Sequence, residues 1–179
     1  MEHGVGASAV VSVSTRDELF GEVRVTLDAA HGLVTVDGDG LPLVVVRRAA
    51  GTGDVDEQVP VGTRDGRRLA LAVDGGAVPV SPGRGRLTRR SFRVDVAHAG
   101  VRYRLVPDSL TGSRLLRGSE RVGELSSDGD GVVVARWVTG AGVRPVEAAL
   151  GYGLAAAFGT GALPMWMLLL DALGDLVPG

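Results

Sequence analysis

The feature that most constrains this chain is a long uncharged stretch near its end. Ala148 to Leu170 are 23 consecutive residues without a charged side chain. A helix that is apolar on every side is stable either inside a protein or in lipid. The stretch is also long enough to cross about 30 Å of hydrocarbon. Either the residues before it form a core that encloses this segment, or the segment crosses a membrane and those residues lie next to that membrane.

The composition of the stretch favours enclosure. Its first half is rich in alanine and glycine, which gain little from lipid, and glycine costs roughly 1 kcal/mol relative to alanine in a helix. The strongly apolar part, Leu163–Leu170, has only eight residues. Arg136 and Arg144 precede the stretch, as the positive-inside rule expects of a membrane span. We expect a buried helix, with a C-terminal membrane anchor as the alternative.

The apolar stretch is interrupted in its middle. A helix can begin at Pro145, with Glu147 in its first turn, where a carboxylate suits the helix dipole. The sequence "GTG" at Gly159–Gly161 weakens or breaks that helix, and a second apolar run follows. Two pieces, Pro145–Phe158 and Leu163–Leu173, are therefore candidates for the central helix, and the sequence leaves the choice open.

Short alternating segments fill the chain before residue 140. In Gly21–Asp28, Val23, Val25 and Leu27 alternate with polar residues, which is the period of a half-buried strand. In Gly32–Arg48, two Val-rich and Leu-rich runs surround Asp-Gly turns, which predicts a hairpin. Other strands are expected at Ala9–Ser14, Arg67–Gly76 (a strand and a turn), Ser91–Ser109 (two strands), Arg114–Arg117, Arg121–Leu125 and Val132–Val138. The polar, Gly-rich segment Ala49–Gly66 is expected to be a loop, with room for one edge strand near Val59–Val61.

Short strands that follow one another at intervals of about 8–12 residues are typical of a sandwich or barrel. The sequence therefore predicts a mainly β fold, an antiparallel barrel or closed sandwich of about nine to twelve short strands. The apolar helix, at about residues 145–174, would be buried inside it. Residues 1–8 are expected to be a flexible N-terminus, and residues 9–179 to form one domain.

No motif in the sequence indicates catalysis. The chain has no cysteine, no G-x-S-x-G and no P-loop, and its three histidines lack the spacing of metal ligands. The two "DGDG" runs lack the glutamate of a calcium loop, so we interpret them as turns. We therefore expect a protein that is not an enzyme, with no catalytic residues, metal or cofactor.

Charge is unevenly distributed along the chain. Net charge is −2, but residues 61–121 carry thirteen arginines against five acids, whereas both flanking regions are acidic. All 19 basic residues are arginine, which binds phosphate bidentately. This asymmetry indicates an anionic partner. The candidate anion-binding or lipid-binding residues are Arg84, Arg86, Arg89, Arg90, Arg93, Arg102 and Arg104.

Two alternatives to a lipid or phosphate site are open for these arginines. They can simply be outward positions of exposed strands that balance acids elsewhere. Nucleic acid is a less favoured partner, because only Phe92 and Tyr103 lie among the arginines and both are expected to point inward. Without exposed aromatic rings there is no platform for base stacking.

Three stretches resemble the tubby C-terminal-like superfamily, which includes the LURP-one-related proteins and the phospholipid scramblases. They are "FRVDVAHAGVRYRLVP", "SRLLRGSERVGEL" and the terminal "MWMLLLDAL". The resemblance implies a closed antiparallel barrel around a central C-terminal helix, and a basic surface that binds phosphoinositide headgroups. The chain lacks the scramblases' cysteine-rich and calcium-binding segments, so scramblase activity is not expected.

These observations predict a non-catalytic binding module that binds anionic lipid or phosphate ligands through an arginine-rich face. Such a protein would be cytoplasmic and peripheral to the membrane. The alternative is a tail-anchored protein whose β domain contacts a protein partner and whose C-terminal segment spans the bilayer.

Overall fold

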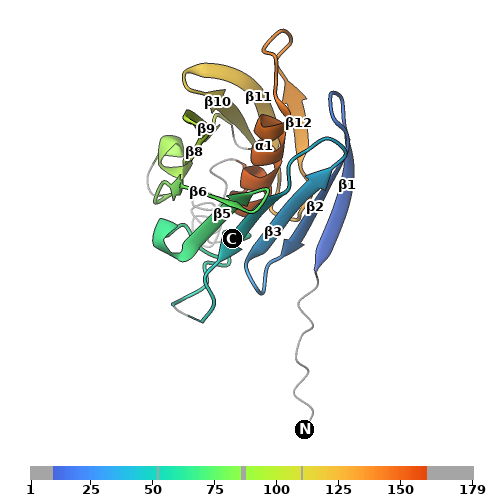
Figure 1. The fold of residues 1–179 in the computed structure, drawn as a ribbon. Helices are drawn as coiled ribbons and strands as arrows, with labels where there is room; N and C mark the ends of the chain where they lie inside the picture. The colour runs from blue at the N-terminus through green and yellow to red at the C-terminus, as the bar shows by residue number, and fades with distance from the viewer. Residues whose placement is uncertain (1–9, 52, 86–87, 110, 161–179) are drawn as a thin grey trace, which may run out of the picture.

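The computed structural model describes residues 10–51, 53–85, 88–109 and 111–160. Within them, twelve antiparallel strands form two six-stranded sheets, and one α-helix lies between the sheets (Figure 1). The predicted mainly β fold and its number of strands are confirmed. The predictions for residues 1–8 and for the second apolar run, Leu163–Leu173, lie outside the described residues.

The first sheet is a meander in which each strand pairs with the next along the chain. It consists of β1 (Val11–Asp17), β2 (Gly21–Asp28), β3 (Leu33–Gly38), β4 (Val44–Arg48), β5 (Leu69–Val73) and β6 (Gly76–Val78). The predicted strand Gly21–Asp28 is β2, and Val23, Val25 and Leu27 are buried as its alternation requires. The predicted hairpin is β3 and β4.

The second sheet repeats this meander with the second half of the chain. It consists of β7 (Val80–Pro82), β8 (Val94–His98), β9 (Val101–Pro107), β10 (Gly112–Arg117), β11 (Glu120–Ser126) and β12 (Val134–Trp137). A short 3-10 helix precedes a strand in each sheet, η1 (Gly66–Arg68) before β5 and η2 (Arg89–Phe92) before β8.

The helix α1 (Pro145–Phe158) fills the space between the two sheets (Figure 1). Every residue from Glu147 to Phe158 is buried, which explains why the helix has no polar face. Its two internal glycines allow close contact with the sheets. A Cβ on Gly151 would lie 3.2 Å from Leu115 in the second sheet, and one on Gly153 would lie 2.9 Å from Val44 in the first.

The structure therefore identifies Pro145–Phe158 as a central helix. The first part of the uncharged stretch, up to Phe158, belongs to the core, and the part from residue 161 onward lies outside the described residues. Among the described helices, none combines the length and apolar character needed to cross a bilayer.

A buried carboxylate anchors the start of α1. Glu147 is fully buried and accepts hydrogen bonds from the Arg144 backbone and from the Arg144 and Arg117 side chains. Desolvation alone would raise the pKa of Glu147, but these hydrogen bonds outweigh it and the pKa is lowered. Arg117 extends from β10, so this network ties the helix to the second sheet.

A second buried carboxylate connects the free edges of the sheets. Asp17, at the end of β1, accepts a 2.8 Å hydrogen bond from the indole nitrogen of Trp137 in β12. It accepts another 2.8 Å bond from the hydroxyl of Tyr152 in α1, and burial followed by this bond raises the pKa of Tyr152. No strand pairing joins the two sheets among the described residues, so the predicted closed barrel is not found there.

The loop predicted for Ala49–Gly66 is confirmed in its described residues up to Asp65, and the optional edge strand near Val59–Val61 is not found. These residues belong to a loop, although Val59 and Val61 are both buried. The backbone nitrogen of Val61 donates to Ala157 in α1 rather than to a strand. The alternating valines therefore mark a loop that packs against the end of the helix.

Candidate functional site

The arginines of β9 point outward from the second sheet, as predicted. Arg102 is exposed and Arg104 partly exposed, whereas the alternating Tyr103 and Leu105 are buried against α1. β9 is a central strand of its sheet, so neighbouring strands on both sides can add side chains to the same outer face.

Strand register brings four arginines together on this face. β9 pairs with β10 so that Arg114 is opposite Val106 and Leu116 is opposite Arg104. η2 and the residue after it add Arg90 and Arg93. A hollow of about 360 Å³ is lined by Arg90, Arg93, Arg104, Val106, Arg114 and Leu116. We call its four arginines the outer-face cluster.

The outer-face cluster carries excess positive charge. One carboxylate, Asp95 in β8, lies 3.2 Å from Arg93 and 2.5 Å from Arg104. Within the described part of the chain, the guanidinium groups of Arg90 and Arg114 have no ion pair and no hydrogen-bond partner. Glu124, opposite Arg114 in register, pairs with Arg121 instead. Asp95 is thus the one carboxylate paired with these four cations in the described structure, and two of the four have no partner there.

The seven predicted arginines do not form one site. Arg90, Arg93 and Arg104 converge in the outer-face cluster, and Arg102 lines an adjoining hollow with Arg104. The others are placed as follows: Arg89 donates to the Asp108 carbonyl at 3.4 Å, Arg84 lines a different pocket, and Arg86 lies outside the described residues.

Arg114 was not among the predicted site residues. It lies in a predicted strand, and its outward position follows from the alternation of "SRLLR". Its closeness to Arg104 depends on the register between β9 and β10, which the sequence does not specify.

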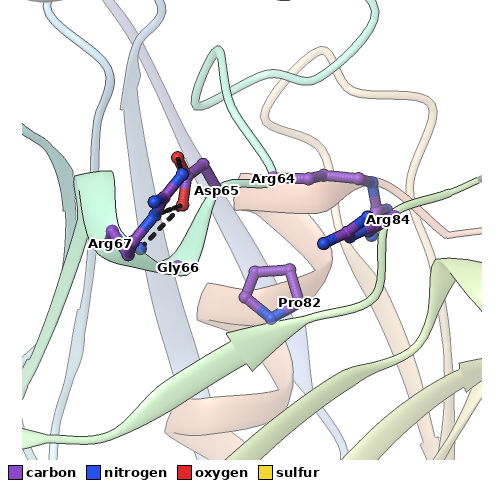
Figure 2. A pocket seen from close by; sticks show the side chains of 6 residues that line it. All are labelled: Arg64, Asp65, Gly66, Arg67, Pro82 and Arg84. Atoms are coloured by element: carbon purple, nitrogen blue, oxygen red, sulfur yellow. Dashed lines mark hydrogen bonds and ion pairs between the residues drawn. The ribbon is translucent and has the colours of Figure 1, made fainter.

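A second, separate pocket lies between η1 and the segment after β7. It has a volume of about 540 Å³ and is lined by Arg64, Asp65, Gly66, Arg67, Pro82 and Arg84. Figure 2 shows Arg64 and Arg84 on one side of this pocket and the paired Asp65 and Arg67 on the other. We call it the Arg64 pocket; it shares no residue with the outer-face cluster.

Arg64 is a partly buried cation that forms no ion pair in the described structure, although the charge of Asp56 acts on it. Its Nη1 donates to the carbonyls of Gly83, at 3.3 Å, and Phe92, at 3.2 Å. Its guanidinium carbon lies 5.1 Å from the ring centre of Phe92 and 5.6 Å from that of Phe158. Desolvation lowers the pKa of Arg64 to about 10, so the group stays charged at neutral pH.

Comparison of the chain with protein-family models, with curated proteins and with solved structures gave no match. The site must therefore be interpreted from its own chemistry. Among the described residues, no three acidic or histidine side chains are grouped as metal ligands. Both hollows instead present guanidinium groups, whose chemistry is the binding of oxyanions.

Proposed function

We propose that this protein is a non-catalytic binding module that docks reversibly on anionic phospholipid through the outer face of its second sheet. The observation that carries the proposal is the outer-face cluster, in which four arginines line one hollow and a single carboxylate, Asp95, pairs with two of them. Phosphate oxygens of lipid headgroups are bidentate partners for guanidinium groups.

The expected strength of binding follows from the charges. Each basic residue near an anionic membrane surface contributes about 1 kcal/mol, and the contribution falls off within a Debye length. Three excess charges thus give about 3 kcal/mol, and Arg102 adds to this on the same side of the sheet. Binding should therefore be weak and sensitive to salt, which suits a peripheral protein at the cytoplasmic leaflet.

Anionic lipid fits this face better than nucleic acid does. Phe92 and Tyr103, the aromatic residues nearest the arginines in sequence, are 9% and 1% exposed. No aromatic residue is among the exposed large hydrophobic side chains of the described chain. Single-stranded nucleic acid is usually bound by stacking bases on exposed rings, and this face has none to offer.

We also propose that this domain is of the tubby-like kind. Two meanders that pack on an apolar helix near the C-terminus support it, as do the paired strands β8 to β11, which contain the stretches "FRVDVAHAGVRYRLVP" and "SRLLRGSERVGEL". Closure into a barrel would occur at the edge between β1 and β12, where Asp17 already connects the sheets.

Vesicle sedimentation tests the proposal. The full chain is mixed with vesicles of phosphatidylcholine alone or with added phosphatidylserine, at low and at moderate salt. Binding should require phosphatidylserine and should weaken as salt rises. Equal sedimentation with both kinds of vesicle, or binding that is indifferent to salt, would contradict it.

The chain offers a matched pair of variants for this test. Arg90→Gln with Arg114→Gln removes the two unpaired charges of the cluster. Arg16→Gln with Arg47→Gln removes two exposed arginines, also without ion pairs in the described structure, from the outer face of the first sheet. The first pair should lose about thirtyfold in affinity, since two charges are worth about 2 kcal/mol, and the second should lose far less.

A further inference from the structure

The Arg64 pocket has a binding edge that the protein itself leaves unused. A guanidinium group has five N–H donors, and its Nε–Nη2 edge forms two parallel bonds to an oxyanion. Both hydrogen bonds of Arg64 come from Nη1. Nε and Nη2 make no hydrogen bond in the described chain, and neither is fully buried. This edge is therefore open to the pocket.

The surroundings of Arg64 fix the direction of that edge. The rings of Phe92 and Phe158 lie within cation–π distance of the guanidinium group, and two carbonyls hold Nη1. An arginine held in this way loses little conformational entropy when it binds a ligand. This differs from the outer-face cluster, where Arg90 and Arg114 have no such contacts in the described structure.

The charges that line the pocket do not balance. Asp65 forms a two-bond ion pair with Arg67, at 3.1 Å and 3.0 Å, so these two side chains neutralise each other. Arg84 has no hydrogen bond or ion pair within the described residues, and Arg64 forms no ion pair there. The carboxylate of Asp56 acts on Arg64 through space but does not line the pocket. Two positive charges that form no ion pair in the described structure therefore line one pocket, together with Arg64's preorganised edge.

We propose that the Arg64 pocket binds a phosphate monoester as its dianion, with the phosphoryl oxygens on Arg64 and Arg84. Two cations match a dianion better than the single charge of a carboxylate or a phosphodiester. The volume of about 540 Å³ lies in the range of small-molecule sites and exceeds the needs of a bare phosphate group. The remainder of the ligand would lie against Pro82, on the wall that Figure 2 shows between the two charged sides. This site does not depend on the proposed membrane function.

Calorimetric titration with phenyl phosphate and with inorganic phosphate, at constant ionic strength, tests the proposal. The wild-type chain should bind phenyl phosphate saturably and more tightly than inorganic phosphate, because the phenyl group adds contact with Pro82. Arg84→Gln should weaken this binding by about tenfold or more, because a charged hydrogen-bond donor is lost. Arg67→Gln is the matched control, since Arg67 lines the same pocket but is already paired with Asp65, and it should change the affinity by less than about threefold.

The phosphate monoester could be free or part of a lipid, and a vesicle arm separates these sources. It compares phosphatidic acid, a monoester, with phosphatidylglycerol, a diester, in the Arg90→Gln/Arg114→Gln background. A preference for phosphatidic acid that Arg84→Gln abolishes, without binding of phenyl phosphate, would assign the site to a lipid headgroup.

The proposal is overturned if the folded wild-type chain binds neither phenyl phosphate nor phosphatidic acid in preference to the controls. It is also overturned if Arg84→Gln and Arg67→Gln bind alike. Arg84 is exposed and forms no hydrogen bond or ion pair within the described residues, so the variant should test binding without unfolding the chain. Unchanged binding of Arg84→Gln to phosphatidylserine vesicles would show that the two sites act separately.

Discussion

The two sheets have the same topology but very different outer faces. On the first sheet, three outward arginines are matched by three outward acids: Arg16, Arg24 and Arg47 against Glu22, Asp28 and Asp37. On the second sheet, five outward arginines face two outward acids: Arg102, Arg104, Arg114, Arg121 and Arg136 against Asp95 and Glu124. Arg90 and Arg93 add further charge beside it.

The inner faces do not share this difference. Both are lined by buried Val and Leu side chains that pack against the same apolar helix. Because the inner faces and the helix account for the fold, nothing in the packing requires the second sheet to be basic. The contrast therefore separates residues that hold the sheets together from residues that are available for binding.

The largest effect should come from the carboxylate that joins the sheet edges. Asp17→Ala leaves the Trp137 indole and the Tyr152 hydroxyl, together with two backbone N–H groups, without their acceptor. We expect a loss of about 3–5 kcal/mol in the free energy of unfolding, measured in urea. Asp37→Ala on the outer face, which removes only an exposed pair with Arg24, should cost less than about 1 kcal/mol.

Glu147 should make the anchoring of α1 to the second sheet sensitive to acid. Its pKa is lowered from 4.5 in the folded chain, so its stabilising effect is full above that pH and is lost as the pH falls through the folded-state pKa. Glu147→Gln should cost about 2–4 kcal/mol at pH 7 and flatten the fall in stability below pH 4.5. An unchanged acid profile would show that another group is responsible; Glu22→Gln is the exposed control.

The two helix glycines should respond differently, because each faces a different sheet. Gly153→Ala would press on Val44, a β-branched side chain with little freedom to move, and should cost about 1 kcal/mol. In Gly151→Ala, the new methyl group would contact the ends of Leu115 and Leu125, which can shift. Because alanine also has the higher helix propensity, the stability of the protein should stay unchanged or rise slightly. The reverse order in thermal unfolding would contradict this packing.

The smallest effect should come from the outer arginines. Arg90→Gln/Arg114→Gln and Arg16→Gln/Arg47→Gln should each change the free energy of unfolding by less than about 0.5 kcal/mol. A larger loss for the first pair would mean that the basic face contributes to folding, and would weaken the case for binding.

Local pattern predicted much of this fold. The strict alternation of Gly21–Asp28 specified β2 to the residue, and the Asp-Gly turns marked the hairpin that follows it. Alternation alone does not prove a strand, as Val59–Val61 shows. There the two alternating valines are buried side chains of a loop. The burial of Pro145–Phe158 likewise depends on the fit of Gly151 and Gly153 against the sheets, which the sequence pattern does not show.

The candidate sites were harder to predict than the fold. A run of arginines between residues 84 and 104 suggested one basic face, but η2 and the turn after β7 direct them to different places. Arg64 was missed because its loop is polar in sequence, and only tertiary structure places Phe92 and Phe158 beside it. Register and loop packing, which decide which charges meet, are not encoded in local periodicity.

The most direct test of the central claim asks which sheet faces the membrane. The chain has no cysteine, so single labels can be placed without other changes. Ala97→Cys lies on the outer face of the second sheet and Ala70→Cys on that of the first; both positions are exposed strand residues. With a fluorescent label and phosphatidylserine vesicles that carry a headgroup quencher, the label at position 97 should be quenched and that at 70 should not. Equal quenching at both positions, or quenching only at 70, would contradict docking through the second sheet.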